Sequence, residues 1–146
     1  MKITLSKNDF DKMVQHAQAE LPDEACGLIA GIDREDGVRE IKKVYCLTNI
    51  DHTNEHFSID PKEQLSAIKD MRSLGLKPLG NWHSHPETPS RPSEEDKRLA
   101  HDPKASYLIL SLEKKDAPVL NAFHVEGSPS YRSAEKEELI IVEEEK

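Results

Sequence analysis

The sequence is poor in the residues and segments that mark secreted and membrane proteins. It has only two cysteines, Cys26 and Cys46, which can form at most one disulfide and lack a paired metal-binding spacing, so we expect buried free thiols. No apolar segment follows the first residues, and the late aliphatic run at 139–142 is far too short to cross a membrane. We therefore expect a cytoplasmic protein with no membrane partner.

Basic residues are also in the minority. Lys and Arg number 20 against 28 Asp and Glu, and the net charge of −8 has the wrong sign for binding a nucleic-acid backbone, so no nucleic-acid partner is expected. Leu, Ile and Val recur periodically, which favours a globular chain over a disordered one. The 146 residues suit a single domain over 1–146, and they exclude a TIM barrel, which needs about 250 residues.

Three helices are expected. The first begins at the Ser6–Asp9 capping box and ends before Pro22. The second begins at Asp60, which is followed by proline, and Gly75 is placed to end it. The third is short and covers about 93–100. The second helix is expected to bury an apolar stripe made of Leu65, Ile68, Met71 and Leu74.

Runs rich in β-branched and apolar residues predict six or seven strands. The ranges are 2–5, 26–31, 38–47, 57–59, 79–85, 107–112 and 119–125. The segment 133–146, beyond a core of about 1–127, is open between a strand and a frayed helix or tail. The pattern predicts an α/β, sandwich-like single domain with a mixed, largely antiparallel sheet flanked by about three helices.

Two histidines lie one residue apart near the end of an expected strand. Side chains two positions apart on a strand point to the same face, so His83 and His85 would present two imidazoles side by side. Asp96 lies in the first turn of the third helix, and three prolines stiffen the loop that leads to it. Two imidazoles, a carboxylate and one open position are a ligand set typical of catalytic zinc.

Each of these residues also has a plain structural interpretation. A His-x-His pair on a strand is often exposed polar alternation, and Ser93 with Asp96 forms a Ser-x-x-Asp capping box that starts a helix without any catalysis. Glu24, at a helix-to-strand turn, would by default be a solvated acid. If zinc is bound, the water that it activates still needs a base, and Glu24 is the candidate.

The pattern resembles the JAMM motif of MPN-type metalloproteases, E…H-[ST]-H-x7-S-x2-D. Its positions are occupied by Glu24, His83, Ser84, His85, Ser93 and Asp96. The resemblance extends to the Pro-x-Glu-x-Cys-Gly-Leu-x-x-Gly segment at 22–31 and to Phe-Ser-Ile-Asp-Pro at 57–61. It covers about residues 1–127, which is nearly the whole expected domain.

The resemblance implies an MPN fold and a zinc peptidase. Glu24 would be the general base and acid, Ser93 would donate a hydrogen bond to the oxyanion of the tetrahedral intermediate, and Ser84 would have a supporting role. A catalytically inactive scaffold is disfavoured, because such members lose ligands and this sequence keeps them all. The implied zinc ligands are His83, His85 and Asp96.

Two other metal motifs fit less well. Residues 52–56 match the H-x-x-E-H signature, which needs both histidines on one face of a helix. This stretch is rich in Asn, Asp and Thr and has no apolar stripe, so we expect a loop in which His52 and His56 could lie near a substrate groove. The residues after His85 do not match the H-x-H-x-D-H pattern of metallo-β-lactamases.

The resemblance implies hydrolysis of a peptide or isopeptide bond. The short chain is similar to prokaryotic members that process ubiquitin-like sulfur-carrier proteins after a C-terminal Gly-Gly, and such a tail could lie along a sheet edge. One alternative is a desampylase-like isopeptidase that acts on lysine-linked conjugates. Another is a non-catalytic binding module for ubiquitin-like proteins.

Overall fold

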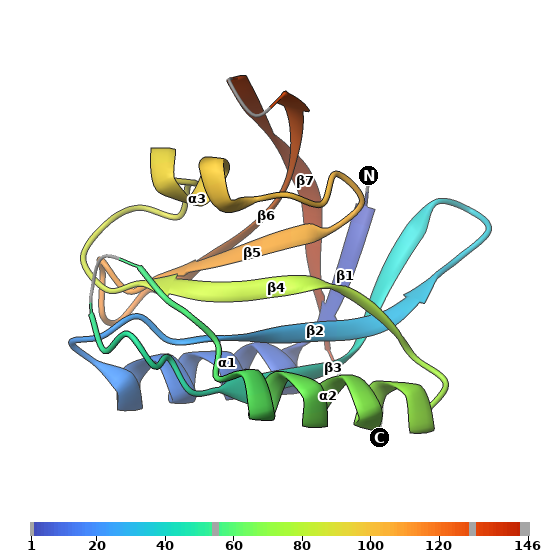
Figure 1. The fold of residues 1–146 in the computed structure, drawn as a ribbon, viewed down its shortest axis with the longest axis horizontal. Helices are drawn as coiled ribbons and strands as arrows, with labels where there is room; N and C mark the ends of the chain where they lie inside the picture. The colour runs from blue at the N-terminus through green and yellow to red at the C-terminus, as the bar shows by residue number, and fades with distance from the viewer. Residues whose placement is uncertain (1, 54–55, 129–130, 144–146) are drawn as a thin grey trace.

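The computed structural model describes residues 2–53, 56–128 and 131–143, which form three helices and seven strands (Figure 1). In chain order these are β1 (Lys2–Ser6), α1 (Lys7–Glu20), β2 (Cys26–Asp33), β3 (Val38–Leu47), α2 (Pro61–Ser73), β4 (Lys77–His85), α3 (Glu94–Leu99), β5 (Ser106–Ser111), β6 (Val119–Ser128) and β7 (Tyr131–Val142). Among the described residues, no helix is both long enough and apolar enough to span a membrane.

The strands form one sheet that closes on itself. Their order is β1-β3-β2-β4-β5-β6-β7, and β7 pairs with β1 to complete the ring. Pairings β2–β3, β2–β4, β5–β6 and β6–β7 are antiparallel, and β1–β3, β1–β7 and β4–β5 are parallel. The predicted mixed, largely antiparallel sheet with three helices is confirmed. The closed ring replaces the expected sandwich, because β7 is long enough to pair with both β6 and β1.

The first helix follows its sequence signals. Ser6 Oγ accepts a hydrogen bond from Asp9 N at 3.1 Å, as a capping box requires. Met13 and Ala17 are buried against the barrel. The spacing that predicted the helix therefore also identified the face that it buries.

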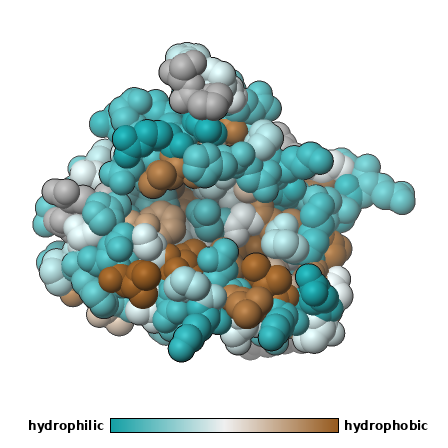
Figure 2. Space-filling model, viewed as in Figure 1, coloured by the Kyte–Doolittle hydropathy of each residue, from teal (hydrophilic) through white to brown (hydrophobic). Residues whose placement is uncertain are grey.

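The predicted buried stripe of α2 is wrong in part. Met71 is buried, but Ala67 rather than Leu65 accompanies it, and Leu65 and Leu74 are 55% and 53% exposed. At about 100° per residue, Leu65 lies on the opposite side of the helix from Ala67. Leu74 is the C-cap residue, beyond the last helical turn, and Gly75 follows it with φ of 71°. Figure 2 shows apolar surface on the face of the molecule that carries α2.

Two segments remain to be compared with the strand predictions. Residues 57–59 form no strand, and Ile59 makes only a single antiparallel bridge with Asn49. The open assignment near the C-terminus is a strand over Tyr131–Val142, and residues 144–146 lie outside the described part of the chain.

Trp82 is the largest of the fully buried side chains. Its Nε1 donates to Tyr45 O at 3.0 Å, across the neighbouring Gly27. A Cβ at Gly27 would lie 1.7 Å from Tyr45 O and 2.3 Å from Trp82 Nε1, so only glycine fits there. Cys26 is buried and Cys46 is partly buried, and both are free thiols.

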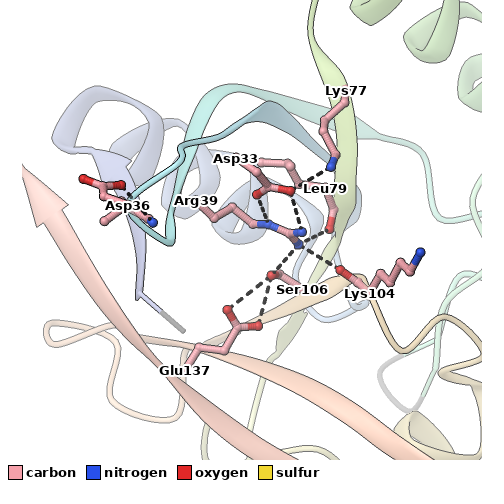
Figure 3. Close-up of polar contacts among 9 residues, drawn as sticks. Asp33, Asp36, Arg39, Lys77, Leu79, Lys104, Ser106 and Glu137 are labelled. Carbon is pink, nitrogen blue, oxygen red and sulfur yellow. Dashed lines mark hydrogen bonds and ion pairs between the residues drawn. The ribbon is translucent and has the colours of Figure 1, made fainter.

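A buried polar cluster joins five strands near the start of β4 (Figure 3). Arg39 donates to Asp33 through Nε at 2.7 Å and Nη2 at 3.1 Å. Ser106 Oγ donates to Glu137, whose carboxylate is buried, at 3.0 Å. Arg39 Nη1 donates to three further oxygens at 3.0–3.1 Å: Leu79 O, Lys104 O and Ser106 Oγ.

Candidate metal centre and active site

The two histidines lie at the end of β4 on the outer face of the barrel. Trp82 and Ser84 point the opposite way, because neighbouring strand residues alternate. The Nε2 atoms of His83 and His85 are 3.1 Å apart, and the two residues are only 3% and 6% exposed. Exposed polar alternation is therefore the wrong explanation of this pair.

The loop after β4 fixes the orientation of His85. Its Nδ1 lies 2.9 Å from Pro89 O, and a carbonyl can only accept, so Nδ1 carries the proton and a neutral ring presents a lone pair at Nε2. Three hydrogen bonds hold the loop. Ser90 Oγ donates to a β5 carbonyl at 2.6 Å, Ser111 Oγ donates to the loop at 2.6 Å, and Asn121 Nδ2 donates to Ser90 O at 3.1 Å.

The capping box at α3 places the carboxylate. Ser93 Oγ accepts from Asp96 N at 3.0 Å, and Asp96 Oδ2 accepts from Ser93 N at 2.9 Å. The same Oδ2 lies 3.3 Å from His83 Nε2 and 3.1 Å from His85 Nε2. Burial opposes the charge on Asp96, but without a cation the histidines can carry protons on Nε2, and their hydrogen bonds to Asp96 then hold its pKa well below the usual range. The capping box of α3 therefore also brings the Asp96 carboxylate to the two histidines.

The three converging atoms fit a tetrahedral metal ion. Ligand atoms bound to zinc at about 2.0–2.1 Å in a tetrahedron lie about 3.3–3.4 Å from one another. The separations among His83 Nε2, His85 Nε2 and Asp96 Oδ2 are 3.1, 3.3 and 3.1 Å. Two imidazole nitrogens and a carboxylate oxygen that face one another can share a metal cation, so the donor set also fits.

Glu24 lies in the connection between α1 and β2 and is 3% exposed, so a solvated acid is the wrong description. Its Oε1 is buried and has no hydrogen-bond partner among the described residues. Burial raises the pKa of Glu24 from 4.5 to about 8, and the nearby Asp96 raises it as well, whereas His85 opposes the shift. A carboxyl poised near neutral pH can both take up and release a proton.

The backbone around Glu24 is held from both sides. On the barrel side, Ser84 N donates to Ala25 O at 2.9 Å, and Ser84 Oγ accepts from Ala25 N at 2.8 Å. On the other side, Glu24 N donates to Thr53 O at 2.7 Å. Ser84, assigned only a supporting role from the sequence, therefore fixes the residue next to Glu24.

Asn49 is a buried connection that the sequence did not single out. Its Nδ2 donates to Glu24 O at 3.0 Å and to His56 O at 3.2 Å. Its Oδ1 accepts from Asp51 N and Ser58 N, both at 3.0 Å. We call residues 56–59 the strap. The side-chain amide of Asn49 thus joins the turn that carries Glu24 to the strap. The sequence did not predict this link, because an Asn in a polar stretch indicates only a turn.

The strap covers one wall of the candidate metal site. The Phe57 ring stacks on His83 with centroids 4.8 Å apart and an interplanar angle of 24°. A pocket of about 330 Å³ opens between the strap, α3 and the strands beneath. His83 and Asp96 line this pocket, and its other lining residues include Ile59, Asn81, Leu99, Tyr107, Ile109 and Val125.

The H-x-x-E-H stretch forms no helix over its described residues. His52 has φ of 48° and an exposed side chain, and Glu55 lies outside the described part of the chain. His56 does line the pocket, where its Nδ1 lies 3.0 Å from Asp51 Oδ2. Of the two histidines expected near a groove, His56 lines this pocket and His52 does not.

Comparison with known proteins places these features in a family. A family model described as "Prokaryotic homologs of the JAB domain" matches residues 6–125. The CysO-cysteine peptidase of Mycobacterium tuberculosis (strain ATCC 25618 / H37Rv) is 31% identical over 113 residues, which cover 77% of this chain and 75% of that protein. The desampylase of Haloferax volcanii is 29% identical over 115 residues, which cover 75% of this chain and 81% of that protein.

A solved structure is also similar. The solution structure of a protein from Desulfitobacterium hafniense superposes with a TM-score of 0.86 at 50% sequence identity. The alignment covers 97% of this chain and 94% of that one. The similarity extends over the barrel and all three helices, because it includes nearly every residue.

Proposed function

This chain belongs to the prokaryotic JAB domain family, and on that premise we propose that it is a zinc-dependent peptidase or isopeptidase acting after the Gly-Gly of ubiquitin-like carriers. The observation that carries the proposal is the convergence of three metal-binding atoms beside a buried, unpartnered glutamate. His83, His85 and Asp96 would hold the zinc ion. Glu24 would be the general base and acid.

Proton transfer is the role of Glu24 in this proposal. Bound zinc would lower the pKa of the attacking water and polarise the scissile carbonyl. Glu24 Oε1 would take a proton from that water and deliver it to the nitrogen of the leaving amine, which departs once it is protonated. Its burial excludes bulk water, and the hydrogen bonds of Ala25 and Thr53 hold its backbone in place.

Ser93 would stabilise charge on the substrate. Its Oγ accepts from Asp96 N, which leaves the hydroxyl hydrogen available to donate. We assign this hydrogen to the carbonyl oxygen, where negative charge develops as water attacks. His85 would keep its Nε2 lone pair directed at the zinc ion, because Pro89 O accepts from its Nδ1.

The names of the relatives support a ubiquitin-like substrate. One is a CysO-cysteine peptidase and another is a desampylase, and both align with three quarters or more of this chain. We propose that the substrate is a ubiquitin-like sulfur carrier joined through its Gly-Gly terminus to cysteine or a peptide. The desampylase supports a second candidate, in which the bond joins the carrier to a lysine side chain.

A cleavage assay with defined conjugates tests the proposal. A Gly-Gly carrier from the same genome would be prepared as a C-terminal cysteine adduct, a peptide fusion and a lysine-linked conjugate. Mass spectrometry would then locate the cut after incubation with zinc, with chelator, and with chelator followed by zinc. We expect cleavage after Gly-Gly that chelation stops and zinc restores. Activity on the lysine conjugate alone would favour the second candidate.

Glu24→Gln is the matched control for that assay. This variant should lose at least about 100-fold in kcat, the usual contribution of general acid–base catalysis, while it binds zinc as tightly as the parent. Full activity in Glu24→Gln would refute the assignment of the base. Binding of the carrier without cleavage by the parent protein would instead support a non-catalytic binding module.

A further inference from the structure

Asn81 is an uncommitted amide in the pocket beside the metal site. It lies on β4 two residues before His83, so the two side chains share a face of the strand. Both line the pocket. Among the described residues, no side chain or backbone group forms a hydrogen bond with the Asn81 amide, although the side chain is half-buried.

Three other polar side chains of the pocket already have partners. Ser58 Oγ donates to Asp51 Oδ2 at 2.7 Å, and His56 Nδ1 lies 3.0 Å from the same oxygen. Tyr107 Oη lies 3.3 Å from Asp102 O. Asn81 therefore faces the pocket with a donor and an acceptor both unused, which is the pair that a peptide backbone satisfies.

The pocket lies on the acyl side of the bond to be cut. His83 and Asp96 line it, but His85 and Glu24 do not. In the proposed function, Glu24 gives its proton to the leaving amine, so the amine must lie on the Glu24 side. The pocket lies on the other side of the metal ligands, so it would bind the substrate residues that precede the scissile carbonyl.

Strand geometry sets which substrate residue reaches Asn81. Residues two apart on β4 are separated by about 7 Å, and an extended peptide lying along the strand has the same repeat. A substrate residue beside Asn81 is therefore two positions before the one whose carbonyl lies at the metal site. In a tail that ends in Gly-Gly, this is the residue immediately before the two glycines.

We propose that Asn81 is a specificity-determining residue that hydrogen-bonds the backbone of the residue preceding Gly-Gly, an inference that rests on the proposed function. Leu99, Ile109 and Val125 line the same pocket, so the pocket accepts an apolar side chain at this substrate position. The substrate class is a carrier whose tail reads apolar residue, Gly, Gly.

A binding measurement tests this in a background that does not turn over. Asn81→Leu, which keeps the size of the side chain but removes both hydrogen bonds, would be combined with Glu24→Gln. Calorimetric titration with the peptide-fused carrier should give a Kd about ten-fold higher than that of Glu24→Gln alone, as expected for two ordinary hydrogen bonds. Asn8→Leu is the matched control, because Asn8 is exposed on α1 outside this pocket.

A modified substrate locates the contact. N-methylation of the peptide nitrogen of the residue before Gly-Gly should weaken binding to Glu24→Gln, yet cause no further loss in Glu24→Gln/Asn81→Leu. Zinc affinity, measured by competition with a chelator, should stay within two-fold in every variant. A Kd within two-fold of that of Glu24→Gln, or equal methylation losses in both proteins, would overturn the assignment of Asn81.

The two proposals fail in different ways. If the protein with Glu24 and Asn81 intact shows no zinc-dependent cleavage of any conjugate, the proposed function is wrong, and the role of Asn81 falls with it. If that protein cleaves after Gly-Gly while Asn81→Leu binds and cleaves equally well, the proposed function stands and only the role of Asn81 is refuted.

Discussion

At the scale of single residues, the protonation of Glu24 depends on where the fold places it. A carboxyl in water is ionised at neutral pH, whereas this one has a pKa of about 8 because it is buried. The free energy that holds the proton comes from the rest of the fold. It can therefore be measured without substrate, as a dependence of stability on pH.

In the metal-free protein, Glu24→Gln should have a higher free energy of unfolding than the parent, and this difference should grow as the pH rises. The pKa of Glu24 is raised from 4.5 to about 8, so between these values the folded chain holds a proton that the unfolded chain has lost. The free energy of unfolding of the parent then falls through this window and levels above pH 8, while glutamine has no such dependence. Urea unfolding in chelator should show a difference of a few kcal/mol that grows from pH 4.5 to 8. A difference that does not vary with pH would mean that Glu24 titrates normally.

Ser93→Gly separates helix capping by Ser93 from its proposed role at the oxyanion. Glycine at an N-cap costs only about a few tenths of a kcal/mol relative to serine, so α3 and the position of Asp96 should be nearly kept. The hydroxyl donor is lost, and we expect kcat to fall by about 100-fold. Steady-state kinetics and thermal unfolding of the zinc-loaded protein would measure both effects. An unchanged kcat would show that Ser93 only caps the helix.

At the scale of elements, the site depends on connections between segments that are distant in the chain. Asn49 links the turn before β2 to the strap that precedes α2. Asn121 on β6 links to the loop whose carbonyl at Pro89 orients His85. The first amide supports the proposed base, and the second supports a proposed metal ligand.

Asn49→Asp and Asn121→Asp should therefore differ in effect. The first replaces the Nδ2 donor by an oxygen that faces two carbonyl oxygens, so it should displace Glu24 and lower kcat by about ten-fold or more, with zinc affinity within about two-fold. The second should weaken zinc binding by about ten-fold, as is typical when a hydrogen bond that orients a ligand is lost. Chelator competition and single-turnover kinetics would separate the two. Equal losses of zinc from both variants would contradict this division.

Local signals predicted much of this arrangement. The caps at Ser6, Asp60 and Ser93 and the two-residue repeat of the histidines are encoded by neighbouring residues, so the helix starts and the shared face of His83 and His85 could be predicted. The roles of these residues in catalysis stay predictions.

Other features depend on contacts between distant residues and were missed. The buried face of α2 is chosen by the sheet beneath it, which is why Leu65 is exposed and Ala67 is buried. The four hydrogen bonds of Asn49 join groups that lie up to 25 positions away in the chain. No periodic pattern encodes such a contact, and closure of the sheet by β1 and β7 is of the same kind.

At the scale of the whole molecule, the polar cluster around Arg39 links several strands of the barrel to one another. This guanidinium contacts β2 through Asp33, β4 through Leu79 O and β5 through Ser106, which in turn reaches β7 through Glu137. The cluster lies near the start of β4, whereas the histidines lie at its end. Stability and metal binding should therefore respond to different substitutions.

Arg39→Met should destabilise the protein by roughly 3 kcal/mol or more, because removal of a buried charge leaves its hydrogen-bond acceptors unpaired. Lys77→Met is the matched control. Lys77 also contacts Asp33, at 2.7 Å, but it is exposed, so its loss should cost about 1 kcal/mol or less. Urea unfolding would measure both, and zinc affinity should change in neither. Equal costs for the two variants would mean that burial of Arg39 contributes nothing.

The position of β1 between β3 and β7 also has a consequence for folding during synthesis. Lys2 pairs with Val38 on one side and with Glu138 on the other, so the first strand finds one neighbour early and the second only after nearly all the described chain has been made. Until then, β1 presents an unpaired edge that can join another nascent chain. The ribosome-bound intermediate is therefore the state in which we expect this protein to need a chaperone.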